Sequence, residues 1–171
     1  MDLWRYDLDR CISSDTNIWL DFACISKIHL PFQLPYKYLM YHEAIEKEVL
    51  QPKDLADKLI EYGIEQIDIS TEEFMYVYEL KKKYLKLSTF DAIALSIAKN
   101  RNIPILTGDL ALRNAAKKEN VEVLGTLGII DQLFDGGYID KHEYKECLNN
   151  LLKHKERRLP ESEIRNRLNT L

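Results

Sequence analysis

Four acidic residues of this sequence stand where a strand ends, where a helix begins, or within a short helix. Carboxylates that cluster repel one another and raise one another's pKa unless a cation sits among them. Oxygen ligands without His or Cys companions favour Mg²⁺ or Mn²⁺ over Zn²⁺, and two such ions can clamp the reacting oxygens of a phosphoryl transfer. The four are Asp15 in SSDTN, Glu48 in EKEVL, Asp91 in STFDAIAL and Asp109 in ILTGDL.

Each of the three aspartates also has a structural interpretation. Asp15 and Asp109 each precede a helical pattern and can cap it through a side-chain oxygen. Asp91 follows Ser88 by three residues, so S-T-F-D matches a capping box. Taken singly, all three positions favour capping over chemistry, and only their convergence would change that.

Glu48 is harder to interpret as an ordinary surface residue. It lies four residues after Ala44 and three after Ile45, so we expect it on the apolar side of its short helix. A carboxylate there needs a partner, which could equally be a Lys or Arg. Glu43 lies off that face, and Asp21, which has no matching partner, is expected at the surface.

The elements that would position these acids alternate between short strands and helices, a pattern that predicts a mainly parallel sheet with helices on both faces. Ligands of such sheets bind beyond the carboxyl ends of the strands. We expect strands at 10–14, 37–41, 64–70, 102–107 and 121–124, and helices at 17–28, 42–50, 52–63, 71–86 with Thr71 as its N-cap, 88–100, 108–120 and 125–137.

Length and composition favour one soluble domain. The chain has 171 residues, 46% of them hydrophobic and 30% charged, which suffices for a core. Its net charge of −4 argues against a generally basic, DNA-coating surface. Three cysteines without metal-ligand spacing fit reduced thiols in a cytoplasm, and we expect no signal peptide and no membrane span. Residues 141–171 are expected to form a helical extension packed on the domain of residues 1–140.

The order and spacing of these motifs resemble PIN-domain ribonucleases, most closely the prokaryotic branch that includes VapC-type toxins. The similarity runs over about 11–140 and is best in STFDAIALSIAK and ILTGDLALRNAAKKENVEVLGTLGIIDQL. It implies a Rossmann-like PIN fold, three-layer α/β/α, and an endoribonuclease that depends on Mg²⁺ or Mn²⁺.

The resemblance also implies roles for individual residues. The four acids, Asp15, Glu48, Asp91 and Asp109, correspond to the catalytic and metal-binding acids of the family, with Glu43 as the alternative to Glu48. Thr16, Asn17 and Thr107 match positions that support the site by hydrogen bonding. A further acid of some members is absent, since Ala111, Leu112 and Arg113 stand there, so we expect no fully ligated second metal in the free protein.

Substrate and partners follow from the same resemblance. Arg113, Lys117 and Lys118 could contact the RNA backbone, although a solvated helix face explains them as well. Many relatives are toxins held inactive by an antitoxin protein, and homodimers are frequent. The alternative function is a catalytically inactive PIN-like module that binds RNA or protein. A nucleotide-binding Rossmann protein is disfavoured because no G-x-G-x-x-G or G-x-x-x-x-G-K-[ST] follows any strand.

Overall fold

The computed structural model describes residues 10–49 and 51–171. Short strands alternate with helices along most of this range, and the helices dominate after Leu124. The strands are β1 (Cys11–Ser14), β2 (Lys37–Tyr41), β3 (Glu65–Ile67), β4 (Ile105–Leu106) and β5 (Val123–Leu124). The helices are α2 (Thr16–Cys24), η1 (Leu30–Gln33), α3 (His42–Glu48), α4 (Leu55–Tyr62), α5 (Thr71–Lys83), α6 (Thr89–Arg101), α7 (Leu110–Lys118), α8 (Thr126–Asp135), α9 (Lys141–Lys153), η2 (Lys155–Arg157) and α10 (Glu161–Asn169).

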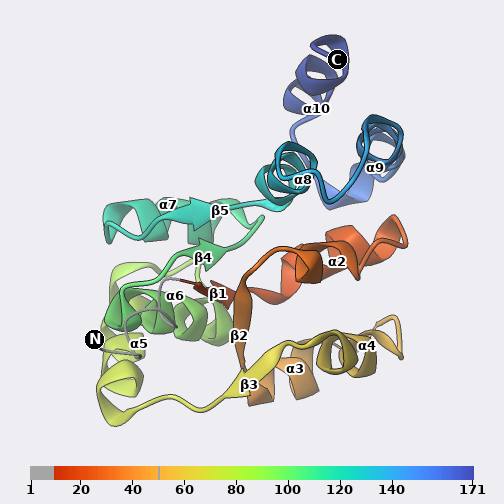
Figure 1. The fold of residues 1–171 in the computed structure, drawn as a ribbon. Coiled ribbons are helices and arrows are strands. Elements are labelled where there is room, and N and C mark those ends of the chain that lie inside the picture. The colour runs from red at the N-terminus through yellow and green to blue at the C-terminus, as the bar shows by residue number, and fades with distance from the viewer. Residues whose placement is uncertain (1–9, 50) are drawn as a thin grey trace, which may run out of the picture.

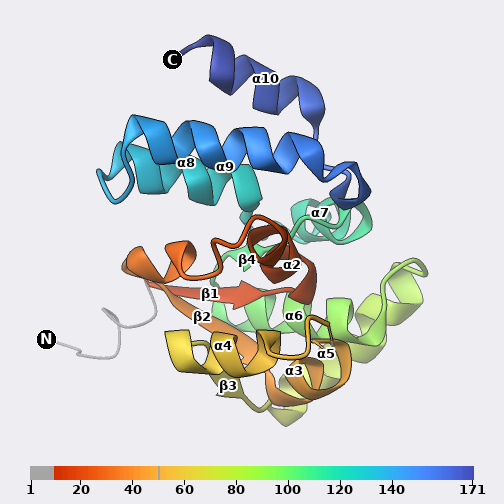
Figure 2. The same ribbon diagram turned by 90° about the vertical axis from the view of Figure 1, so that its right-hand side faces the viewer.

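The five strands form one parallel sheet in the order β3-β2-β1-β4-β5. β1 is central, with Ser13 opposite Leu39 on one side and Ile105 on the other. Helices flank the sheet on both faces (Figure 1), and the tip of β1 points to the edge where α2 begins (Figure 2). The predicted three-layer α/β/α class is therefore confirmed, and the carboxyl ends of the strands share one edge.

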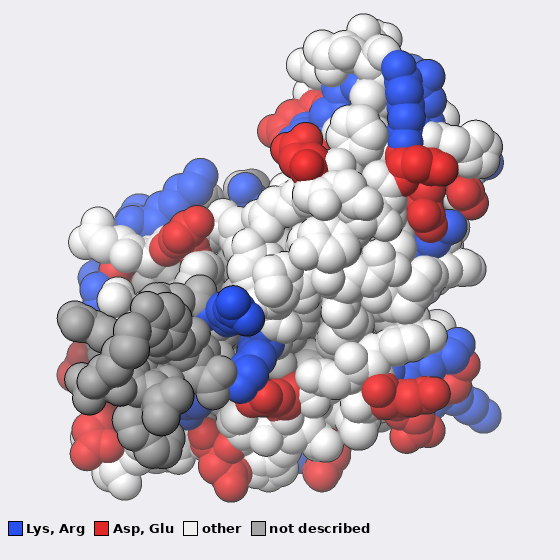
Figure 3. All heavy atoms as spheres, viewed as in Figure 1, with Lys and Arg blue, Asp and Glu red and all other residues white. Residues whose placement is uncertain are grey.

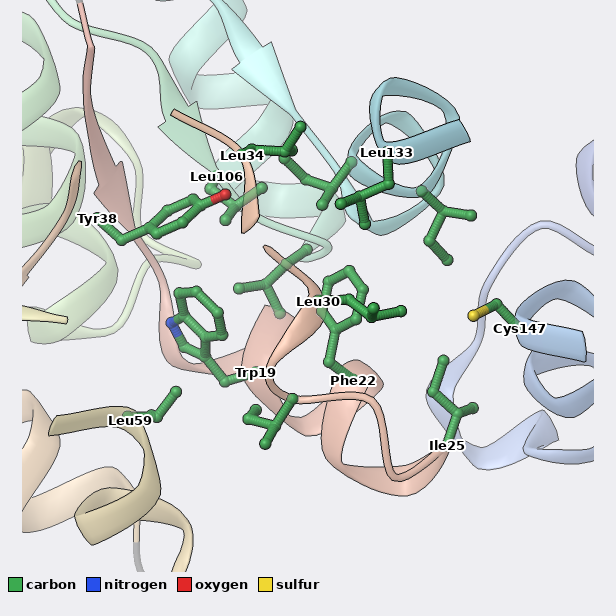
Figure 4. Close-up of a cluster of buried hydrophobic side chains, with 14 of the residues drawn as sticks. Trp19, Phe22, Ile25, Leu30, Leu34, Tyr38, Leu59, Leu106, Leu133 and Cys147 are labelled. Carbon is green, nitrogen blue, oxygen red and sulfur yellow. The ribbon is translucent and has the colours of Figure 1, made fainter. Parts of the chain in front are cut away.

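Each face of the sheet has its own hydrophobic core. Alternate residues of a strand point to opposite faces, so Leu106 joins the core beneath α2 and α8 while Ile105 joins the core beneath α5, α6 and α7. Trp19 of α2 is completely buried in the first core (Figure 4), where it stacks on Phe32 at 5.1 Å between ring centroids. Its indole N–H donates to Ser14 Oγ at 2.7 Å, which fixes α2 against the end of β1.

The C-terminal helices complete the first core. Tyr144, Cys147 and Leu148 of α9 and Ile164 of α10 are buried in the same cluster as Phe22 of α2, and Figure 1 shows α8, α9 and α10 stacked on the α2 side. The apolar residues that recur at helical spacing in 141–171 are thus the ones that pack against the rest of the chain. The boundary at 140/141 stays a prediction, and residues 1–9 lie outside the described part.

Several expected bounds differ from the structure, and two of these differences concern α2 and α5. The first helix ends at Cys24 rather than near residue 28, because Ser26 adopts a left-handed backbone with φ of 58°. The N-cap of α5 is Ser70 rather than Thr71: Ser70 Oγ accepts from the Glu73 N–H, and the Glu73 carboxylate accepts from the Ser70 N–H. The capping box satisfies two amide donors at once.

Glu119, at the end of α7, joins that helix to α5. Its carboxylate accepts hydrogen bonds from Lys83, Tyr84 and Tyr76. Burial alone would raise its pKa, but these donors outweigh burial and lower the pKa of Glu119 to about 2. Because the folded protein binds this proton more weakly than the unfolded chain, the ionised carboxylate stabilises the fold above its unfolded pKa of 4.5.

We therefore expect Glu119→Gln to lower the free energy of unfolding by about 1 kcal/mol near neutral pH. The difference from the parent should shrink as the pH falls from the unfolded pKa of 4.5 toward about 2, where the carboxylate protonates in both states. Urea unfolding at several pH values measures this. Glu122→Gln, at a neighbouring exposed acid, is the control, and an equal loss in both variants would contradict the prediction.

The face from which the strands start is shown in Figure 3. Charged side chains of both signs lie around its margin, and a broad uncharged area lies between them.

Among the described helices, none combines the length and the apolar character that a bilayer span requires.

Candidate active site

The predicted acids lie at the edge where the strands end. Asp15 follows β1 directly, Glu48 is the last residue of α3, Asp91 lies in the first turn of α6, and Asp109 is the N-cap of α7. Asp15 and Glu48 line one small pocket together with residues of α6. The parallel sheet therefore brings together elements that are far apart in the sequence.

Asp15 is the most buried of the four, with 4% of its surface exposed. Its Oδ1 accepts from the Thr16 N–H at 2.7 Å, and its Oδ2 accepts from the Thr107 hydroxyl at 2.9 Å. Its own N–H donates to the Leu106 carbonyl of β4 at 2.9 Å. Asp15 is thus the N-cap of α2, as the sequence allowed, and it is also held in place by the neighbouring strand end.

Glu48 is more exposed than expected, although Ala44 and Ile45 are buried as predicted. Its helix ends at this residue, so the carboxylate can leave the apolar stripe, and its partner is neither Lys nor Arg. Thr16 Oγ1 donates to Glu48 Oε2 at 2.9 Å and lies 3.4 Å from Asp15 Oδ1. A single hydroxyl therefore stands between the two carboxylates.

Glu43, the alternative to Glu48, has other partners. Its carboxylate accepts from the Tyr41 hydroxyl at 3.0 Å and pairs with Lys47 one turn further along α3. The hydrogen bond from Lys47 lowers the pKa of Glu43 below its ordinary value. This geometry favours Glu48 as the glutamate of the site.

Asp91 and Asp109 both cap helices. Asp91 Oδ2 accepts from the Ser88 N–H at 2.7 Å while Ser88 Oγ accepts from the Asp91 N–H at 3.0 Å, so the predicted capping box is present. Asp109 Oδ1 accepts from the Leu112 N–H at 2.8 Å. Thr107 Oγ1 also accepts from the Asp109 N–H at 3.0 Å, so one threonine side chain links Asp109 to Asp15.

The electrostatics of the site favour a cation. Burial raises the pKa of Asp15 to about 7, and the nearby charges of Asp91 and Glu48 act in the same direction, against hydrogen bonds from Thr107 and Thr16. Burial and the Asp91 charge also raise the pKa of Glu48. The groups with the largest effects on Asp15 include no Lys or Arg. No Lys or Arg is among the groups that most affect Glu48 either, so no cation dominates the surroundings of these two carboxylates.

The supporting residues are in part as predicted. Thr16 and Thr107 contact the Asp15 carboxylate. Asn17 instead contacts a residue away from the acids, since its backbone carbonyl accepts from Arg157 at 2.9 Å. The three cations of α7 do not line one groove: Arg113 and Lys118 line two different grooves, both of which include Leu110, and Lys117 lines neither of them.

The prediction that Asp21 lies at the surface is wrong. Only 2% of Asp21 is exposed, and its carboxylate accepts from Arg157 Nε at 2.6 Å and from the Thr126 hydroxyl at 2.5 Å. Burial raises the pKa of Asp21, and these two donors oppose it. Asp21 stands three residues after Ile18 and directly before Phe22, both buried, so helical spacing was the available signal.

Comparison with known families agrees with this geometry. A family model, DUF3368, described as a PIN domain, matches residues 11–171. The chain belongs to the PIN-domain family. No match was found among curated proteins or among solved structures.

PIN domains are generally nucleases, and PIN-domain nucleases generally use divalent metals. Within the described part of this PIN domain, no three His, Cys, Asp or Glu side chains lie close enough together to hold an ion. The chemistry of the donors nevertheless fits Mg²⁺ or Mn²⁺, because all four candidates are carboxylates and no Lys or Arg is among the described groups that most affect Asp15, the most buried one. For the carboxylates to share one ion, the side chains of Asp91 and Asp109 would have to move away from the amides that they now cap.

Proposed function

We propose that this PIN domain is a Mg²⁺- or Mn²⁺-dependent endoribonuclease that hydrolyses RNA phosphodiester bonds. The observation that carries the proposal is the buried Asp15 at the end of the central strand, whose pKa is raised to about 7 with no cation among its strongest neighbours. A divalent ion would relieve the repulsion between the Asp15 carboxylate and the nearby charges of Asp91 and Glu48. When bound, such an ion lowers the pKa of a water molecule and neutralises charge on the scissile phosphate.

The residues of the chain would have distinct tasks in this reaction. Asp15, Asp91 and Asp109 would hold the ion, with Thr107 fixing the orientation of Asp15. Glu48 would be a further ligand or would orient the attacking water, since its carboxylate shares the Thr16 hydroxyl with Asp15. The Ser88 and Leu112 amides, now bound by Asp91 and Asp109, would release one carboxylate oxygen each.

We further propose that the protein is the cytoplasmic toxin of a toxin–antitoxin pair. An antitoxin that inserts a basic side chain beside Asp15 would supply the missing counter-charge and exclude the metal. This step rests on analogy with other PIN domains, as does a homodimeric assembly.

Two glutamates of α3 provide the test of the nuclease proposal. With millimolar Mn²⁺, the parent should cleave single-stranded RNA and EDTA should stop it. Glu48→Gln should lose at least about tenfold in rate, because it removes a charge from the site. Glu43→Gln, at the same charge change on the same helix, should cleave at the parent rate.

Equal cleavage rates for the parent and Glu48→Gln would show that Glu48 is not a residue of the catalytic site. A parent that does not cleave RNA at all would instead support the second candidate, a PIN domain that binds without catalysis. That candidate is favoured by the roles that Asp91 and Asp109 already have as helix caps.

A further inference from the structure

A groove lies beside the acids and is far larger than the pocket among them. It is bounded by α7, β5, the first turn of α8 and the start of α10, and its volume is about 490 Å³, within the roughly 300–1,000 Å³ typical of ligand pockets. The pocket lined by Asp15 and Glu48 measures about 10 Å³, close to the room that one water needs. The space between Asp15 and Glu48 is therefore too small for a nucleotide, and a bound RNA strand would lie on an adjoining surface.

The groove is rich in arginine, and we call it the arginine groove. Arg113, Arg158 and Arg167 line it, against the single acid Glu163. Arg167 is already neutralised by Asp131, which it contacts at 2.8 Å. Arg158 is exposed, and its side chain forms no ion pair with any residue from 10–49 or 51–171. The net charge of the lining is thus positive on a chain whose total is −4.

The two available arginines are held at defined places. Arg158 follows η2 with a left-handed backbone, φ 55°, directly after Arg157, which is anchored to Asp21. Arg113 donates to the Thr107 carbonyl at 3.3 Å and crosses Gly125 so closely that a Cβ there would lie 2.8 Å from its Nη1. Glycine at 125 therefore makes room for the guanidinium.

The arginine groove reaches the proposed catalytic residues through one loop. Gly108 lines the groove and lies between Thr107, which binds Asp15, and Asp109. Residues of α7 and of the start of α10 line the same groove, and in Figure 2 both elements lie on the side to which β1 points. A strand in the groove would thus continue toward the acids without crossing another element of the sheet.

We propose that the arginine groove binds the RNA strand adjacent to the scissile phosphate, with Arg113 and Arg158 each contacting a backbone phosphate. This inference rests on the proposed nuclease function. A planar guanidinium matches the oxygens of a phosphate, and the exposed Leu110 together with Leu159 offers apolar surface to ribose and base. An acidic peptide could also pair with the arginines, but peptide binding would not explain why the groove lies next to the proposed site of phosphodiester cleavage.

Binding of a labelled single-stranded RNA of about twelve nucleotides tests this directly, in an Asp15→Asn background so that cleavage does not interfere. Arg158→Gln should weaken binding roughly three- to tenfold and make the slope of log K against log salt shallower by about 0.7, the contribution of one phosphate in a single strand. Arg113→Gln should act similarly. Arg158→Gln is the decisive variant, because Arg113 also donates to the Thr107 carbonyl and its loss could disturb the position of Thr107.

Lys99→Gln is the control with the same charge change, since this exposed lysine lines a separate groove beside Pro104, just before β4 begins. Its affinity and salt slope should stay at the parent values. Unchanged binding in Arg158→Gln, or a loss confined to Lys99→Gln, would overturn the proposal. Tighter binding of polyglutamate than of RNA, lost in Arg158→Gln, would also overturn it in favour of a protein partner. Cleavage by the parent is measured separately, so a failure of the groove is distinct from a failure of the nuclease assignment.

Discussion

Asp15→Asn should make the metal-free protein more stable above neutral pH. The folded pKa of about 7 exceeds the ordinary value of 3.8 because of burial, so the folded state binds this proton more tightly than the unfolded chain. Stability linked to Asp15 is therefore full below the ordinary value and is lost as the pH rises through about 7. Removing the charge should recover on the order of 2 kcal/mol at alkaline pH.

Thermal unfolding as a function of pH measures this gain. The advantage of Asp15→Asn should fade as the pH is lowered toward the ordinary value of 3.8. Asp57→Asn, at an exposed acid in the first turn of α4, is the control and should show no such profile. An Asp15→Asn protein that is less stable than the parent at alkaline pH would show that the carboxylate is not strained by its surroundings.

The same substitution should abolish Mn²⁺-dependent RNA cleavage. Loss of a direct ligand is expected to exceed the roughly 10–100-fold loss seen when only an outer partner of a metal ligand is removed. Mn²⁺ should also raise the melting temperature of the parent but not of the variant, since only an ion bound by the folded state stabilises it. Undiminished cleavage by Asp15→Asn would exclude the assignment of this site.

Arg157→Met should be strongly destabilising, although Arg157 lies outside the proposed catalytic set. Removing one partner of a buried ion pair leaves the other charge unpaired and costs about 3 kcal/mol, which corresponds to a fall of roughly 6–12 °C in melting temperature for a domain of this size. Asp21 is 2% exposed and has a pKa already raised by burial. Loss of Arg157 would raise that pKa further.

The pH dependence distinguishes this explanation from simple loss of packing. Protonation of Asp21 removes the unpaired charge, so the deficit of Arg157→Met should be largest at alkaline pH and should shrink as the pH approaches 3.8, the ordinary value of Asp21. Arg165→Met, which breaks an exposed pair with Glu161 on α10, should cost well below about 1 kcal/mol. A deficit that does not vary with pH would indicate that the methylene stem, rather than the charge, matters.

Much of the fold follows from local patterns in the sequence. Short apolar runs bounded by glycine, proline or capping residues predict the five strands, and the S-T-F-D capping box places the start of α6 correctly. The parallel order of the strands then requires Asp15 and Asp109 to lie at one edge, because each follows a strand. For these elements, the spacing of apolar residues and the chemistry of the caps contain the needed information.

Long-range pairing was beyond such patterns. Nothing local to Asp21 indicates that its partner is Arg157, 136 residues later, and a helix with one acid near its apolar side reads equally well as a solvated surface. The partner of Glu48 was missed for a related reason. Its Thr16 hydroxyl comes from another helix, and only the packing of α2 beside α3 brings the two together.

The bond between Asp21 and Arg157 also bears on the order of events during synthesis. Helix α2, which begins directly after Asp15, leaves the ribosome before η2 and the buried residues of α9 and α10. Contacts so distant in sequence form slowly. Helix α2 therefore gains its bonds to Arg157 only after translation has passed η2, so an unfinished chain lacks the contact that neutralises Asp21.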